Sequence, residues 1–115
     1  MDELKNKLRA FVDERDWSQF HTPKNLAMAL SVEVAELAEI FQWLTESQSR
    51  KLSPEKLEAA RDEIGDVLIY LTRLADTLGI DPVAAAHAKL EKAKAKYPAE
   101  IVRGKSLKYN EYPKA

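Results

Sequence analysis

Residues 25–44 are the stretch that most restricts how this chain can fold. They contain neither Gly nor Pro, and their apolar side chains recur at helical spacing. At about 100° per residue, one face of the predicted helix carries Leu26, Leu30, Leu37, Ile40 and Leu44. Glu33 lies in the middle of that apolar face, and Glu36 lies at its edge, one turn further on. A carboxylate that faces a protein interior needs a cation, a hydrogen-bond donor or a proton.

A second long stretch, residues 57–78, repeats this arrangement. Its apolar face consists of Val67, Tyr70, Leu71, Leu74 and Leu78. Glu63 lies among these residues, and Asp66 lies at their edge. Carboxylates that point into one volume repel each other unless a cation lies between them, and a hard divalent cation prefers oxygen ligands. The pattern predicts a metal site formed by two helices, with partly exposed structural acids as the alternative.

Four helices are predicted, at residues 2–15, 23–46, 54–78 and 82–97. A loop at 16–22 and a polar linker at 47–53 join them, and an irregular tail follows at 99–115. Thr22, Ser53 and Asp81 each precede a Pro, which is the signature of a capped helix start. Gly79 is a suitable C-terminal stop. The predicted fold class is therefore all-α.

The bulk composition is typical of one soluble globular domain spanning residues 1–115, with 45% hydrophobic and 32% charged residues. A net charge of −1 gives no attraction to nucleic acid or to an anionic membrane. The absence of Cys excludes disulfides, thiolate zinc sites and Cys nucleophiles. Since no membrane span or signal peptide is visible, we expect a cytoplasmic protein without a membrane partner.

Several residues outside the acids suit a nucleotide ligand. Trp17 and His21 fall in the loop at 16–22, and Trp17 and Trp43 are candidates to stack a base. Lys94 lies on the inner face of the fourth helix, where it would contact a phosphate, pair with a carboxylate or extend outward to solvent. A site made only of acids suits Mg²⁺, which usually binds together with phosphates. These parts together favour magnesium-dependent hydrolysis of a nucleotide.

Four segments carry a family resemblance: ERDWSQFHTPKNL at 14–26, EVAELAEIFQW at 33–43, DEIGDVLIYL at 62–71 and KYPAEIVRGKSLKY at 96–109. In this order they resemble the MazG-like all-α nucleoside triphosphate pyrophosphohydrolases, and in particular the dCTP pyrophosphatase subgroup. The metal motif of that family, Glu-x-x-Glu followed by Glu-x-x-Asp on the next long helix, matches Glu33, Glu36, Glu63 and Asp66.

The resemblance implies that these four acids hold Mg²⁺ and carry catalysis. It implies attack of water on the α–β phosphoanhydride of a substrate such as dCTP, and assembly into a homo-oligomer, either a dimer or a tetramer. The substrate-binding residues that it implies, together with His21 from the loop, are Trp17, Trp43, Tyr70, Lys89, Lys94 and Tyr97.

Two positions depart from the family pattern. Ala93 stands where relatives often have Asn, and Leu8 stands where dCTP-cleaving relatives have His. Neither departure affects the acids, but both bear on the preference for sugar and base. The expected pyrophosphohydrolase activity includes house-cleaning of modified nucleotides. Alternative functions are action on another nucleotide pyrophosphate and a non-catalytic helical oligomerisation module.

Overall fold

Three helices begin where capping residues precede a Pro. The computed structural model describes residues 2–112, apart from the side chain of Tyr109. Helices α2 (Pro23–Phe41), α4 (Pro54–Thr77) and α5 (Pro82–Lys96) start after Thr22, Ser53 and Asp81, whose side chains accept backbone N–H groups of the first turn. These caps satisfy donors that a helix cannot pair internally. The sequence prediction of the three starts is confirmed.

The other elements are α1 (Asp2–Glu14), a 3₁₀ turn η1 (Ser18–Phe20), α3 (Glu46–Ser49), α6 (Ala99–Val102) and η2 (Tyr109–Glu111). Residues 2–112 contain no strand, so the predicted all-α class is confirmed. Gly79, with φ of 68°, follows α4 in the left-handed conformation expected of a C-terminal stop.

Helix α2 is shorter than predicted, because it ends at Phe41 rather than near residue 46. Thr45 and Gln48 form a capping box that starts α3, and part of the predicted linker at 47–53 is therefore helical. The predicted irregular tail also contains two short helical pieces, α6 and η2. Its last residues, 113–115, lie outside the described part of the chain.

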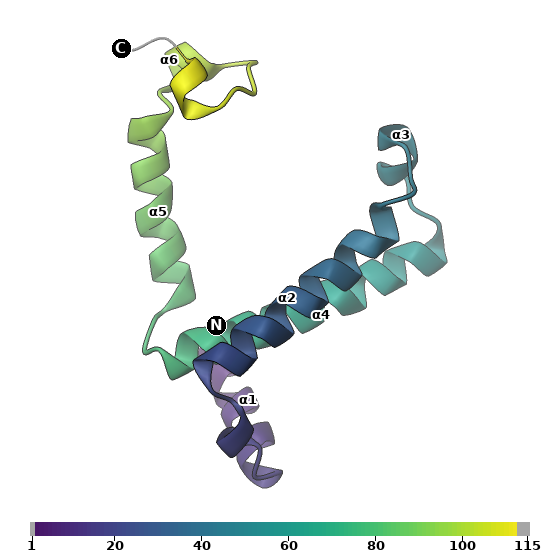
Figure 1. Cartoon of the computed structure of the whole chain (residues 1–115), viewed down its shortest axis with the longest axis vertical. Coiled ribbons are helices and arrows are strands. Elements are labelled where there is room, and N and C mark those ends of the chain that lie inside the picture. Colours follow the sequence, from purple (N-terminus) through teal and green to yellow (C-terminus); the bar gives the residue numbers. More distant parts are fainter. Residues whose placement is uncertain (1, 113–115) are drawn as a thin grey trace. The chain divides into compact units, whose positions relative to one another are not determined.

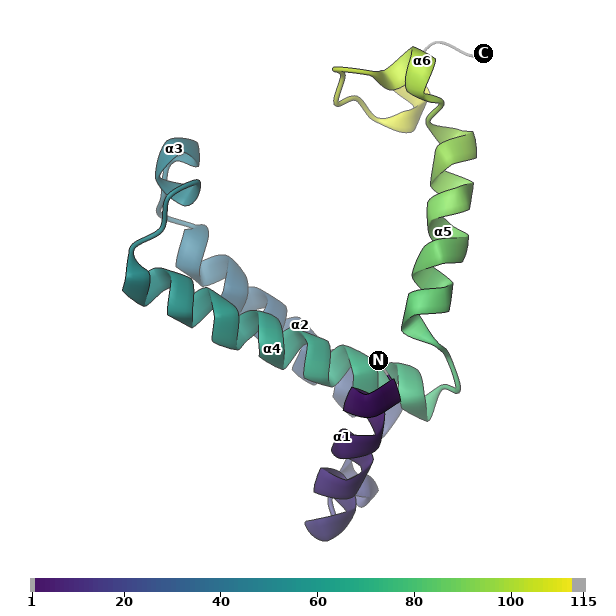
Figure 2. The same ribbon diagram turned by 180° about the vertical axis from the view of Figure 1, so that it is seen from behind.

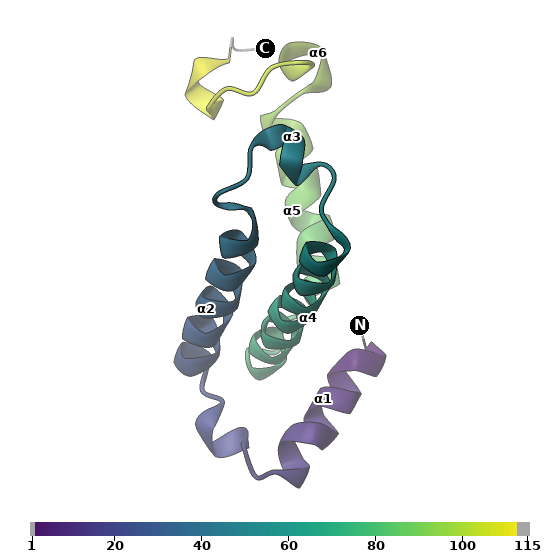
Figure 3. The same cartoon turned by 90° about the vertical axis from the view of Figure 1, so that its right-hand side faces the viewer.

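Helices α2 and α4 pack side by side along most of their length and run in opposite directions (Figures 1, 2 and 3). The predicted apolar face of α2 is its less exposed face, from Leu26 through Glu33 to Ile40. Helix α1 packs against α4 as well. Among the described residues, the buried apolar side chains are Leu8, Val12, Leu26, Ala60 and Ala75.

The buried face of α4 differs from the prediction in its second half. Leu71 and Leu78 are exposed, whereas Thr72 and Arg73 are buried. Thr72 and Arg73 are buried because α1 contacts this part of α4, where Arg9 bonds to Asp76, so that a second side of the helix is covered. A single periodic stripe in the sequence cannot show that a helix has two neighbours.

The chain divides into two compact units, one up to Ile80 and one from Asp81 onward. The first contains α1 to α4, and the second contains α5, α6 and η2. In the second unit, the Tyr112 hydroxyl accepts a hydrogen bond from the backbone of Leu107 and donates one to the carbonyl of Lys105. Among the described residues, no helix has the length and apolar character that crossing a bilayer requires.

Candidate active site

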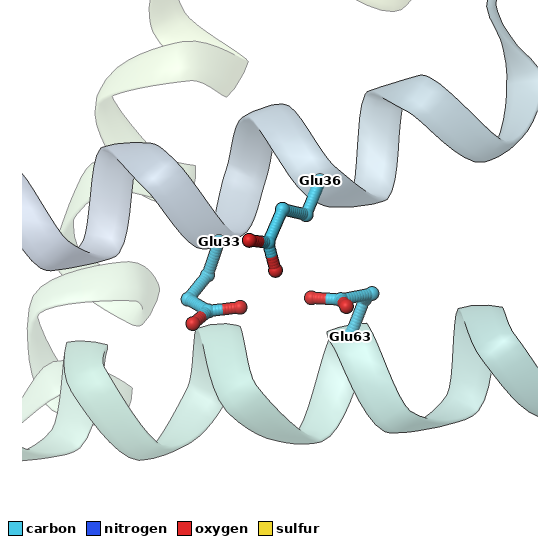
Figure 4. A group of neighbouring side chains, drawn as sticks. All are labelled: Glu33, Glu36 and Glu63. Carbon is cyan, nitrogen blue, oxygen red and sulfur yellow. The ribbon is translucent and has the colours of Figure 1, made fainter.

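Three of the four predicted acids meet between α2 and α4. Glu33 and Glu36 extend from α2 towards Glu63 on α4 (Figure 4). One carboxylate oxygen from each residue lies within 4.8 Å of the other two. The convergence follows from the sequence, because each acid occupies a position on or beside the face that its helix turns to the other.

Asp66 is placed close to this group without being part of it. It is half-buried and lies three residues after Glu63 on α4, but its carboxylate is not among the three oxygens that converge. Its negative charge nevertheless contributes to raising the pKa of Glu33. The predicted fourth ligand thus lies within electrostatic range of the cluster.

The electrostatics of the cluster favour a proton or a cation. The neighbouring Glu63 carboxyl, which can share a proton with Glu33, is the main reason that the pKa of Glu33 rises to about 7, and burial is the second. When both groups are ionised, neither can donate a hydrogen bond. The Oε2 atoms of Glu33 and Glu63 are then buried without a hydrogen-bond partner among the described residues. Buried acceptors without a partner are costly, and an oxygen-only cluster of this kind could hold a metal ion.

A pocket of about 270 Å³ lies against the second half of α4. It contains three of the predicted substrate-binding residues, Trp17, His21 and Tyr70. The remaining lining residues are Lys7, Leu8, Phe11, Val12, Ile69 and Arg73. Tyr70 follows Asp66 by one turn of α4, so the pocket continues along the helix that also carries part of the acid cluster.

The end of α1 places Trp17 in this pocket. Asp16 adopts the left-handed conformation, with φ of 54°. The N–H of Trp17 bonds to the carbonyl of Val12 and the N–H of Asp16 to that of Asp13, which is the Schellman arrangement. The indole then meets the ring of Phe11 edge to face, with 5.6 Å between the centroids. The position of Trp17 is therefore fixed by backbone geometry as well as by ring packing.

Arg73 is a pocket residue that sequence reasoning missed. Its Nε donates to Nδ1 of His21 at 3.4 Å, and its Nη1 donates to Asp76 at 3.5 Å. Burial, followed by the charge of Arg73, lowers the pKa of His21 and favours the neutral ring that can accept this bond. The sequence signal that could have found Arg73 was its spacing. Arg73 follows the predicted substrate-binding residue Tyr70 by three positions and therefore lies on the same face of α4.

Trp43 is not brought into this pocket. It follows the C-terminal end of α2, it is 86% exposed, and it does not line the cavity that contains Trp17. The two tryptophans therefore do not form one base-binding wall within the described residues of a single chain.

The remaining predicted residues belong to the second unit. Lys94 forms an ion pair with Glu91 at 3.0 Å on the exposed side of α5, which matches the alternative of a lysine paired with a carboxylate. Tyr97 meets Tyr112 edge to face at 5.9 Å, and Lys89 is exposed. Their approach to the nucleotide stays a prediction.

These features define an all-α protein with a carboxylate cluster suited to a metal ion and an aromatic pocket further along the same helix. A sequence model of the MazG-like family matches residues 28–111. The chain is 41% identical to dCTP pyrophosphatase 1 of Homo sapiens and covers 68% of that protein with 98% of its own length. It is 39% identical to dCTP pyrophosphatase 1 of Mus musculus, with 99% of this chain and 68% of that protein covered.

A solved pyrophosphatase from Archaeoglobus fulgidus has the same fold. Its TM-score with this chain is 0.76 at 49% sequence identity, and the match covers 85% of this chain and 92% of that one. The chain belongs to the MazG-like family, as its motifs predicted.

Proposed function

We propose that this chain is a magnesium-dependent nucleoside triphosphate pyrophosphohydrolase that converts dCTP or a related deoxynucleotide to the monophosphate and pyrophosphate. The observation that carries the proposal is the pair of buried, unpartnered carboxylate oxygens on Glu33 and Glu63. They lie in a family member whose relatives are named as dCTP pyrophosphatases. The activity and the choice of substrate are supported by those relatives.

The acid cluster fits the proposed cofactor. Glu33, Glu36 and Glu63, with Asp66 next to them, would hold Mg²⁺ through oxygen atoms, the ligands that this ion prefers. Bound there, magnesium would polarise phosphoryl oxygens and lower the pKa of water. A carboxylate of the cluster would accept the proton of the water that attacks the α phosphorus. The bond from that phosphorus to the bridging oxygen breaks, and pyrophosphate leaves.

The pocket would receive the nucleoside. Tyr70 lies four residues after Asp66, which corresponds to about 6 Å along the helix axis at about 1.5 Å per residue. Phosphates held at the acids would thus leave the sugar and base at the aromatic pocket. Trp17 and Tyr70 supply ring surfaces there, and base stacking on such rings tolerates several bases.

The test is a panel of normal and modified deoxynucleoside triphosphates incubated with Mg²⁺ and resolved by chromatography. We expect a monophosphate and pyrophosphate as primary products and no turnover in chelator. A diphosphate with orthophosphate would contradict the proposal. Preference for modified nucleotides would indicate a house-cleaning role, and complete inactivity would favour a non-catalytic module. Glu63→Gln should be inactive, whereas Glu39→Gln, an exposed acid on α2, is the matched control.

We also propose that the chain forms a homo-oligomer. Apolar side chains on both long helices are exposed in the single chain, including Met28, Val32, Ile64, Leu68 and Leu71. Burial of such surface stabilises association by about 25 cal/mol per Å² before the costs of binding. Light scattering at micromolar concentration should give the mass of a dimer or a tetramer, and the mass of a monomer would contradict this proposal.

A further inference from the structure

We propose that Arg73 determines base specificity by donating hydrogen bonds from its guanidinium to a ring carbonyl oxygen of the base in the pocket. The inference rests on the proposed function, because it assumes that the pocket receives the nucleoside. Arg73 is only 9% exposed, and it lines the cavity together with Trp17 and Tyr70. A buried cation at the wall of an aromatic pocket is well suited to orient a ligand.

The charge balance around Arg73 leaves it incompletely compensated. Its carboxylate partner, Asp76, is held more closely by Arg9, at 2.6 and 2.8 Å, than by Arg73 at 3.5 Å. Two guanidinium groups thus share one carboxylate. The third member of the network, His21, has a lowered pKa and adds no negative charge. A ligand atom that carries partial negative charge and accepts hydrogen bonds would compensate the charge of Arg73.

The donors and acceptors that line the pocket favour a ligand that accepts hydrogen bonds. A guanidinium has five N–H donors, and the hydrogen bonds of Arg73 use one on Nε and one on Nη1. Nδ1 of His21 is occupied as an acceptor by this Nε–H. Among the described residues that line the pocket there is no carboxylate, and the wall from α1 includes the apolar Leu8, Phe11 and Val12. The polar side chains therefore present mainly donors.

Position along α4 assigns Arg73 to the base rather than to the phosphates. Arg73 lies seven residues after Asp66, about 10 Å along the axis at about 1.5 Å per residue, and on the same face. Tyr70 lies between the two. Phosphates bound at the acids would be separated from Arg73 by the nucleoside, so that the group within its reach is the edge of the base.

The test compares two ligands that have nearly the same shape but differ in their acceptors. These are thymidine triphosphate and its difluorotoluene isostere, in which C–F groups replace both ring carbonyls and a C–H group replaces the ring N–H. For the parent protein with Mg²⁺, we expect the dissociation constant and KM to be about tenfold to a hundredfold lower for the natural nucleotide. In Arg73→Met this ratio should fall to about threefold or less. Arg61→Met is the matched control, since Arg61 lies exposed on the same helix, and it should keep the parent ratio.

The ratio separates a direct role from a structural one. If Arg73 only stabilised the fold or bound a phosphate, Arg73→Met would weaken both ligands equally, which would overturn the inference. Arg73→Lys retains the charge but loses the planar donor fork, and it should give an intermediate ratio; it carries the test if the Met variant does not fold. Equal binding of both ligands by the parent also overturns the inference, even if pyrophosphate is released. A parent protein that binds the natural nucleotide about tenfold to a hundredfold more tightly than the isostere, but hydrolyses neither, would support the inference and contradict the proposed function.

Discussion

Arg9 on α1 donates two hydrogen bonds to the carboxylate of Asp76 on α4, at 2.8 and 2.6 Å. The hydrogen bonds from Arg9 lower the pKa of Asp76, and its charge adds to the effect. Because Asp76 also receives a hydrogen bond from Arg73, this one carboxylate connects α1, α4 and the pocket wall. The helix that carries Trp17 at its end is thereby held against the helix that carries the acids.

We predict that Asp76→Ala destabilises the protein more than Arg9→Ala does. Loss of Asp76 leaves the buried Arg73 without its carboxylate, which should reduce the free energy of unfolding by about 1–3 kcal/mol. Loss of Arg9, which is about half exposed, still leaves Asp76 paired with Arg73. Urea unfolding of both variants at neutral pH measures the difference, and equal losses would contradict the shared role of Asp76.

Replacement of the two tryptophans should have different effects. Trp17→Ala removes a pocket wall and should weaken nucleotide binding by about 1–3 kcal/mol, the range for stacking of a base on an aromatic ring. Trp43 does not line that pocket. Trp43→Ala should therefore change the affinity for the nucleotide only if another chain of an oligomer brings Trp43 to the ligand. KM and thermal midpoint should be measured together at a fixed protein concentration. A lower midpoint with unchanged KM would make Trp17 a packing residue only.

Glu63→Gln should abolish activity and leave the metal-free fold at least as stable as the parent. The substitution removes one charge from three carboxylates that lie within 4.8 Å of one another, at nearly constant shape. Magnesium at about a hundredfold excess over its dissociation constant should stabilise the parent by about 2.7 kcal/mol and the variant by much less. Thermal melts in chelator and in magnesium provide the comparison. A variant that is less stable in chelator would indicate a structural acid instead.

The stability of the metal-free protein should depend on pH through Glu33. Its pKa is raised from 4.5 to about 7, so the folded chain binds this proton more tightly than the unfolded chain does. The resulting stabilisation is fully present below pH 4.5 and is lost as the pH rises through about 7. Denaturant unfolding in chelator across this window should show a decline that is smaller in Glu33→Gln. Subtracting the two curves removes the contribution of His21, which both proteins share.

Local signals in the sequence were sufficient to predict the starts of the three long helices and the positions of the acids. The capping residues before each Pro depend only on neighbouring backbone groups, and three helix starts were therefore predicted correctly. The helical spacing of the apolar residues in α2 predicted that Glu33 lies on the covered face of this helix. The apolar stripe of α4 predicted that Glu63 faces it. The end of α2 was wrong by several residues, because a competing capping box at Thr45 outweighs the continuing apolar pattern.

The sequence by itself determined the helices, their caps and the convergence of three acids, since these follow from spacing along the chain and from hydrogen bonds between near neighbours. Only the tertiary structure decided that Arg73 is buried, because this depends on α1 covering a second side of α4. It likewise joined Arg9, Asp76, Arg73 and His21 into one network. Contacts between residues more than fifty positions apart leave no periodic trace in a single sequence, and they exist only once the helices have packed.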